Sequence, residues 1–250
     1  MDILALNCGS SSVKYQLFDW DKKVVVAKGM VERVVIGDSF ILHEVPGRET
    51  YREDSDCPDH KCAVDLIMRT LTSPAHGVLK DITQIAAVGH RVVHGGERFT
   101  KSVLIDADVL EAVTEVQHLA PLHNPPNIAG IEGALAVLPG VPQIAIFDTA
   151  FHQTMPEHAY LYPLPFEWYE KYGVRRYGFH GTSHHYVSKR VAAILGKPGP
   201  ACKAMACDLA KGVAGARSVR MGPRSIQCHA RAGRRPEPPI EGSPLRGARG

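Results

Sequence analysis

Two continuous apolar runs, each placed behind a helical pattern, restrict the fold of this chain more than any other feature. The runs are ITQIAAVGH and VPQIAIFD, which cover residues 82–90 and 141–148. Continuous rather than alternating apolar residues are typical of strands buried on both faces, as in parallel sheets covered by helices. Both runs end at polar or charged residues, so we expect each strand to present such side chains at its carboxyl end.

Four segments with apolar residues at helical spacing accompany these runs. They are HKCAVDLIMRTL (60–71), DADVLEAVTEVQHL (106–119), NIAGIEGALAVLPG (127–140) and HHYVSKRVAAILGK (184–197). The N-terminal part instead indicates strand, turn and strand, with LALN and VKYQLFD around CGSSS and the β-branched KKVVVAKGMVERVV behind them. An antiparallel meander followed by alternating helices and strands predicts an α/β fold with a mixed sheet and flanking helices.

The last fifty residues differ from the rest in charge and composition. Residues 201–250 hold 10 Lys+Arg and 3 Asp+Glu, a net charge of +7, whereas residues 1–200 carry −4. Past KPGP (197–200), Arg, Gly, Pro and Ala dominate and no apolar period persists. We therefore expect residues 1–196 to form one region and residues 197–250 a basic tail that is disordered or out of frame. A basic extension that binds nucleic acid or membrane is the alternative.

The N-terminus and the cysteines bear on the compartment. The run MDILAL is short and lacks the basic flank of a signal peptide, and no run reaches transmembrane length. The six cysteines are scattered, which is typical of free thiols in a reducing compartment. Cys57, His60 and Cys62 are a candidate zinc site, but no second ligand pair follows, so a solvated loop is favoured. We expect a cytoplasmic protein without a membrane partner.

Polar residues collect where the predicted strands end. Four such segments run from Asn7 to Lys14, Arg91 to Gly96, Asp148 to His152 and Arg176 to His184. Taken singly, each has a structural explanation: GSSS as a hairpin turn, His90 and His94 as core histidines, Asp148 and HGTSHH as helix caps. In open α/β sheets, however, ligands bind beyond the carboxyl ends of strands, so together the segments predict a ligand site.

The residue types in these segments suit phosphate chemistry. Backbone N–H groups and hydroxyls of a Gly/Ser turn can surround an anion, and Lys14 adds a positive charge, although the GxxxxGK[ST] pattern of a P-loop is absent. Arg91 offers a planar fork for a carboxylate or phosphoryl group, and Asp148 can orient a nucleophile or help to hold Mg²⁺. Phosphoryl transfer requires such positioning and neutralisation of charge.

Five segments together resemble the acetate kinase family, in order and over residues 1–200. They are LALNCGSSSVK, AAVGHRVVHGG, LAPLHNPPN, IAIFDTAFHQTMP and RRYGFHGTSHHYV. The resemblance implies a fold of the actin, hexokinase and Hsp70 ATPase type, whose first domain has a mixed five-stranded sheet with flanking helices. It also implies reversible transfer of the γ-phosphoryl group of ATP to acetate with Mg²⁺ or Mn²⁺, and a homodimer.

The resemblance also implies roles for single residues. On the ATP side, Asn7 belongs to the metal site, and Ser10, Ser12 and Lys14 belong to the phosphate loop. The implied catalytic residues are Arg91, His123, Asp148 and His180. Among these, the resemblance implies that Arg91 also binds the substrate carboxylate and that His123 and His180 stabilise the phosphoryl group in flight. It further implies that Val93 and Leu122 form walls of the acetate methyl pocket.

The chain departs from the family in its last part. The family's second half carries an HxGxG adenosine-side loop and a second arginine, and CDLAKGVAGARS (207–218) supplies neither the histidine nor the asparagine of that loop. We therefore expect the second domain, with the nucleotide half of the site, to be largely absent, through loss of the reading frame near residue 200. Two alternatives are a non-catalytic fragment that binds small anions and a protein whose basic tail binds nucleic acid. Propionate or butyrate in place of acetate also stays open.

Overall fold

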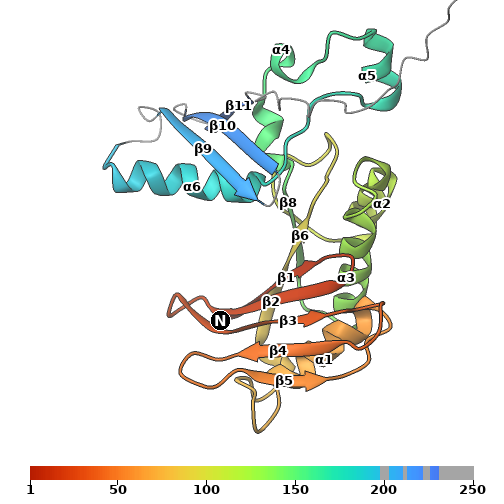
Figure 1. The fold of residues 1–250 in the computed structure, drawn as a ribbon, viewed down its shortest axis with the longest axis vertical. Helices are drawn as coiled ribbons and strands as arrows, with labels where there is room; N and C mark the ends of the chain where they lie inside the picture. Colours follow the sequence, from red (N-terminus) through yellow and green to blue (C-terminus); the bar gives the residue numbers. More distant parts are fainter. Residues whose placement is uncertain (198–202, 211–212, 222–225, 231–250) are drawn as a thin grey trace, which may run out of the picture.

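A computed structural model describes residues 1–197, 203–210, 213–221 and 226–230 of the chain. Its main feature is an eight-stranded mixed sheet with the order β5-β4-β3-β2-β1-β6-β8-β7 (Figure 1). The strands are β1 (Asp2–Cys8), β2 (Ser12–Asp19), β3 (Val24–Glu32), β4 (Phe40–Glu44), β5 (Tyr51–Asp54), β6 (Ile85–Val92), β7 (Val103–Leu104) and β8 (Gln143–Phe147). The sheet is mixed as predicted but has eight strands rather than five, because the meander continues through β4 and β5 and the short β7 adds an edge.

The first five strands form the predicted antiparallel meander. Each pairs with the next along the chain, and in the first hairpin Asn7 of β1 lies opposite Lys14 of β2. Strand β2 alternates cleanly, since Val13, Tyr15 and Leu17 are buried whereas Lys14 is exposed. This alternation gives the sheet one face for the core and one face for other contacts.

The two apolar runs become the central parallel strands. Strand β6 pairs in parallel with β1 on one side and with β8 on the other. The carboxyl ends of β1, β6 and β8 therefore lie at the same edge of the sheet, where Cys8, Val92 and Phe147 are their last residues. Polar side chains at these three ends are brought together by this topology alone.

Helices cover the core face of the sheet (Figure 1). They are α1 (His60–Leu71), α2 (Ala107–Glu115) and α3 (Asn124–Val137), and the first and third pack against each other and against the strands. Asp59 caps α1 by accepting from the backbone N–H of Cys62, and Gly133 of α3 allows close approach to Lys61 of α1. The main core lies between this helix pair and strands β1 to β4.

The last described part contains α4 (Glu157–Tyr160), α5 (Phe166–Tyr172), α6 (Gly181–Ile194) and a second, antiparallel sheet of order β11-β10-β9. Its strands are β9 (Lys203–Ala210), β10 (Val213–Met221) and β11 (Ile226–Ala230), and β9 contacts α6. The sequence shows no persistent apolar period past residue 200, yet these three strands pair with one another through backbone hydrogen bonds. The remaining residues of the 197–250 region lie outside the described part, except Lys197.

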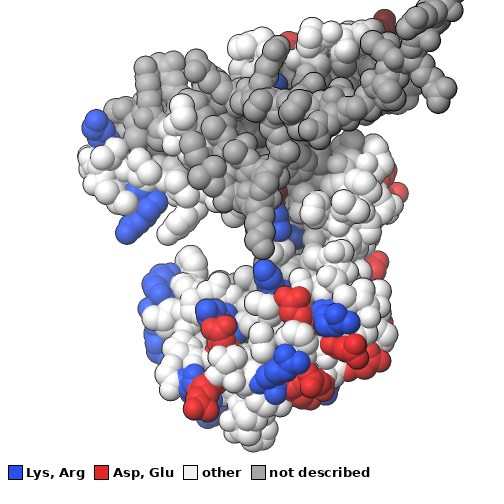
Figure 2. All heavy atoms as spheres, in the orientation of Figure 1, with Lys and Arg blue, Asp and Glu red and all other residues white. Residues whose placement is uncertain are grey.

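Two surface features bear on the classes of partner. In the described residues, no helix combines the length and the apolar character that a membrane span requires. Figure 2 shows Lys and Arg intermingled with Asp and Glu on the visible face of the part that holds the meander. A nucleic-acid surface usually carries clustered positive charge, and this face does not.

Candidate active site

Three side chains meet where β1, β6 and β8 end. The guanidinium of Arg91 donates from Nε and Nη2 to Oδ2 of Asp148 at 3.0 and 2.7 Å, and from Nη1 to Oδ1 of Asn7 at 3.2 Å. The side chain of Asp148 is 3% exposed, whereas that of Arg91 is 40% exposed. The buried carboxylate therefore fixes one side of the guanidinium fork while the other side stays accessible.

A cavity of about 620 Å³ opens on the sheet face opposite the main core. Alternate residues of four strands line it, because side chains two positions apart point to the same face. The alternate residues are Ala5, Asn7, Lys14, Gln16, Gly89, Arg91 and Ile146; Leu6 and Tyr15, which lie between them, and Asp148, which follows β8, also contribute to the lining. The start of α6 adds His180, Thr182 and Ser183 to the same cavity, so the sheet and this helix form its two sides.

A second cavity of about 310 Å³ adjoins the first. Its lining combines the polar residues Arg91, His123, Asp148 and His180 with the apolar residues Val93, Leu119, Ala120, Pro121, Leu122 and Phe179. Arg91, Asp148 and His180 line both cavities and so mark their junction. A cationic fork beside apolar walls suits a small carboxylate with a short apolar tail.

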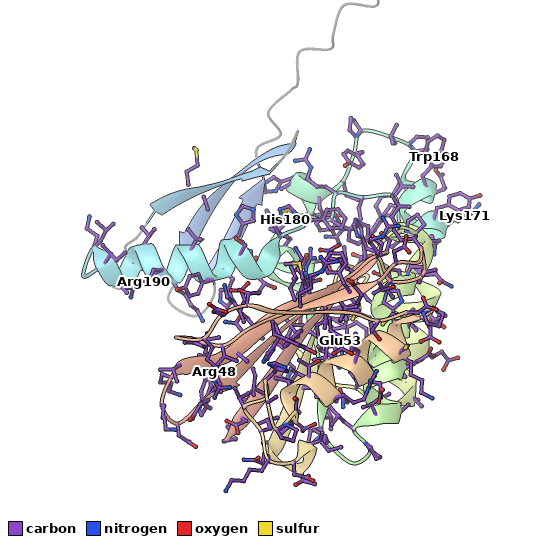
Figure 3. The ribbon with its side chains drawn as sticks, turned by 60° about the horizontal axis from the view of Figure 1, so that its bottom comes forward. Arg48, Glu53, Trp168, Lys171, His180 and Arg190 are labelled. Carbon is purple, nitrogen blue, oxygen red and sulfur yellow. The ribbon has the colours of Figure 1, made fainter. Side chains whose placement is uncertain are left out.

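His180 has an unusual backbone conformation at this junction. It precedes α6 with φ of 56°, in the left-handed region that residues other than glycine adopt only at a cost. The next residue, Gly181, donates its N–H to the carbonyl of Asp148 at 2.9 Å, and a Cβ there would lie 2.2 Å from that oxygen. Only glycine fits, so the end of β8 and the start of α6 are fixed together, with His180 between helix and sheet (Figure 3).

The predicted phosphate loop is a tight hairpin turn between β1 and β2. The N–H of Gly9 donates to the carbonyl of Ser12 at 2.8 Å, and Nε2 of His60 contacts the carbonyl of Gly9 at 2.7 Å. Lys14 lines the larger cavity, whereas Ser10 and Ser12 line neither cavity. The predicted loop is therefore present, but its two hydroxyl residues lie outside the cavities.

The structure places all the predicted acyl-side residues in one cavity lining. Arg91, Val93, Leu122, His123, Asp148 and His180 all line the smaller cavity. Val93 is buried, whereas Leu122 is 76% exposed. Phe179 is a further, aromatic wall that the sequence did not predict, although it directly precedes His180 in the segment RRYGFHGTSHHYV.

His90 and His94 lie in the core, in agreement with the structural explanation that the sequence offers for them. His90 is buried and its Nε2 contacts Oε1 of Gln143 at 2.7 Å, and burial lowers its pKa. His94 is 1% exposed, and its Nδ1 accepts the N–H of Gly96 at 3.0 Å. Burial lowers the pKa of His94 to about 4, and repulsion from His118 and Arg175 adds to this effect.

The metal-binding capacity of the site is limited. Asn7 and Asp148 supply hard oxygen atoms of the kind that Mg²⁺ prefers. Among the described residues, no group of three or more His, Cys, Asp or Glu side chains is placed to hold a metal, and this includes Cys57, His60 and Cys62. The residues present thus fit a Mg²⁺ ion that phosphates and water also ligate, and do not fit a cage built by the protein alone.

Comparison with known proteins gives concordant matches. The sequence profile of the acetokinase family matches residues 2–228. The chain is 76% identical over 213 residues to the acetate kinase of Geobacter metallireducens, with 85% of this chain and 51% of that protein covered. It is 69% identical to that of Trichlorobacter lovleyi, with the same two shares covered. The chain thus spans about half the length of the curated relatives it matches.

Two solved structures are similar in fold. The crystal structure of Porphyromonas gingivalis acetate kinase superposes with a TM-score of 0.84 at 44% identity, over 90% of this chain and 56% of that chain. The structure of a propionate kinase from Francisella tularensis superposes with a TM-score of 0.81 at 37% identity, over 92% of this chain and 57% of that one.

Proposed function

The chain belongs to the acetokinase family, and from this premise we propose that it carries the acyl-side half of an enzyme that phosphorylates acetate with ATP. The fold is of the actin, hexokinase and Hsp70 ATPase type that the sequence predicts. Because the chain spans about half the length of its relatives, the activity is proposed for a whole protein in which this chain is completed. The reaction is reversible and yields acetyl phosphate and ADP.

One observation carries this proposal: Arg91 lies at the junction of the two cavities with part of its fork uncommitted. The bonds to Asp148 and Asn7 use three of the five N–H donors of a guanidinium. Among the described residues, no acceptor bonds the other two N–H groups of Arg91, so both are available to a ligand. A carboxylate in the smaller cavity and a phosphoryl group in the larger one can both reach this cation.

The proposed reaction needs no nucleophile from the protein. A carboxylate oxygen of acetate attacks the γ-phosphorus, the new O–P bond forms, and the bond to the bridging oxygen breaks as ADP leaves. Acetate is already deprotonated at neutral pH, so no base is needed. The protein supplies alignment and charge neutralisation through Arg91, His123 and His180, while Asp148 orients Arg91.

The phosphate-side residues have proposed roles of the same kind. Lys14 interacts with the nucleotide phosphates, and we retain Ser10 and Ser12 as phosphate-loop residues whose hydroxyls must turn toward the larger cavity when phosphate binds. Asn7 and Asp148 would hold a Mg²⁺ (or Mn²⁺) ion together with the phosphates. The ion supplies neutralisation of the charge on the transferring oxygens.

The acyl specificity is proposed from the smaller cavity. Val93 and Leu122 stand beside Arg91 as walls for the methyl group of acetate. Leu122 is largely exposed, so one wall does not close the cavity, and propionate or butyrate remains the alternative. The similar fold of a propionate kinase agrees with a site that small changes adapt to a longer acyl chain.

Several expectations from the sequence stay predictions. These are the division into residues 1–196 and 197–250, the loss of the reading frame near residue 200, the cytoplasmic location and the homodimer. A non-catalytic protein that binds small anions is the second candidate function, supported by the free donors of Arg91 at the junction of the two cavities.

A hybrid enzyme tests the proposal. The chain would be joined, at the end of the matched region, to the second half of the Geobacter metallireducens relative. Acetyl phosphate formed from ATP, Mg²⁺ and acetate would be trapped with hydroxylamine. We expect turnover that His180→Ala largely removes and that Arg48→Ala, an exposed arginine away from both cavities, leaves unchanged. A folded hybrid without turnover would contradict the proposal.

A further inference from the structure

The geometry points to Asn127 as a positioning residue that sets the spacing between the phosphate loop and the acyl pocket, an inference that rests on the function proposed above. Asn127 is 3% exposed and lies in the first turns of α3. Its Nδ2 donates to the carbonyl of Cys8 at 2.6 Å, and its Oδ1 accepts the N–H of Val93 at 3.0 Å. A single amide therefore joins the end of β1 to the residue that follows β6.

The carbonyl of Cys8 and the N–H of Val93 lie past the last residue pair of the parallel ladder between β1 and β6. The parallel pairing of β1 with β6 extends only to Leu6 and His90. Past that pair the ladder between β1 and β6 ends, and buried backbone groups there need other partners. Asn127 supplies one acceptor and one donor, which no aliphatic side chain and no ionised carboxylate can do.

Each segment that Asn127 contacts carries a residue of the proposed site. Cys8 adjoins Asn7 and the turn that begins at Gly9, and Val93 is itself a wall of the smaller cavity. The backbone N–H of Asn127 also donates to the carbonyl of His123 at 3.1 Å. The side chain of Asn127 therefore joins the phosphate side to the acyl side, and its backbone N–H also bonds the histidine that lies before α3.

The packing of α3 against β1 leaves little freedom for this arrangement. A Cβ at Gly130, one turn beyond Asn127, would lie 2.1 Å from Sγ of Cys8, so the helix backbone approaches the strand end very closely. On the other side of Cys8, His60 of α1 contacts the carbonyl of Gly9. The start of the phosphate loop is thus fixed by two helices, and only Asn127 among these contacts also reaches the acyl pocket.

A neighbouring buried amide provides a matched control. Asn124 is fully buried on the same helix and bonds the N–H and the carbonyl of His94 at 3.1 and 2.9 Å and the carbonyl of Val113 at 3.4 Å. None of these bonds reaches β1. Loss of the Asn124 amide should destabilise the protein in a similar way without changing the spacing between the loop and the pocket.

The test compares a ligand that spans both subsites with its two parts. Affinities of chain 1–250 for acetyl phosphate, acetate and inorganic phosphate would be measured by calorimetry for wild type, Asn127→Ala and Asn124→Ala. We expect Asn127→Ala to lose at least about tenfold in affinity for acetyl phosphate, because a two-ended ligand depends on the spacing of its sites. The change for acetate and for phosphate alone should be several times smaller. Equal losses for all three ligands would overturn the inference.

Hydrogen exchange gives a second readout that needs no ligand. In Asn127→Ala, amides in residues 5–14 and 89–96 should both exchange faster, whereas Asn124→Ala should affect only the second segment. Unchanged exchange in residues 5–14 would overturn the inference. If wild type binds no acetyl phosphate, the proposed function fails while the exchange result still decides the role of Asn127. Should Asn127→Ala not fold, Asn127→Asp keeps the acceptor for Val93 and removes the donor to Cys8 once ionised.

Discussion

Acidification should destabilise this protein through His94. The folded chain holds this ring neutral, with a pKa lowered from 6.5 to about 4, chiefly by burial. Protonation at Nδ1 would also remove the acceptor that the N–H of Gly96 uses at 3.0 Å. In the unfolded chain the same ring is hydrated and titrates near its ordinary pKa.

The size and sign of the effect follow from these two pKa values. Between pH 6.5 and about 4 the unfolded state binds more protons at His94 than the folded state, so stability falls as the pH falls. Stability is greatest above that window, and the loss is complete below it. This difference between the pKa of His94 in the unfolded and in the folded chain corresponds to about 3 kcal/mol in the free energy of unfolding.

Urea unfolding of chain 1–250 between pH 7.5 and 4 would measure this loss. His94→Asn is the reference, because the Asn carbonyl can replace Nδ1 as an acceptor for Gly96 and does not titrate. His43 and His90 also have pKa values lowered chiefly by burial and contribute equally in both proteins. Wild type should lose about 3 kcal/mol more than His94→Asn over this range. The same pH dependence in both would refute the reasoning.

Three substitutions test other parts of the account. In the completed hybrid, Arg91→Ala should lower kcat/KM for acetate by the equivalent of about 2–5 kcal/mol while the KM for ATP changes little. Equal losses for both substrates would count against the carboxylate role. Glu97→Ala removes the ionic partner of Arg175, a side chain 4% exposed, and should reduce stability in urea by about 1–3 kcal/mol; an unchanged midpoint would show that the pair is not needed. Gly181→Ala forces a Cβ against the carbonyl of Asp148 and should cost about 1–3 kcal/mol, with weaker acetyl phosphate binding. Undiminished stability and binding in this variant would mean that helix and sheet are not fixed together there.

The position of the site follows from sequence patterns because it depends on topology. The apolar runs that end before Arg91 and at Asp148 predict buried parallel strands, and parallel strands bring their carboxyl ends to one edge. Asn7 joins them because β1 lies beside β6. The contact among Asn7, Arg91 and Asp148 thus needs no more than strand order and the alternation of side chains.

Features that depend on local packing were not predictable in this way. The role of Asn127 requires the point at which β1 and β6 separate, and periodicity gives no sign of that point. The position of Ser10 and Ser12 outside the cavities depends on the turn geometry set by Gly9. Strands β9 to β11 pair through their backbones, and the sequence past residue 200 carries no apolar period that would predict them.

Binding of acetyl phosphate to chain 1–250 tests most directly the claim that this chain carries the acyl-side half of a phosphoryl-transfer site. The ligand would be titrated and followed by ³¹P NMR, with Arg91→Ala as the site variant and Arg48→Ala as the control. Saturable binding to wild type and to Arg48→Ala, with affinity lost in Arg91→Ala, is the predicted result. Binding that is absent from wild type, or that Arg91→Ala retains unchanged, would contradict the account.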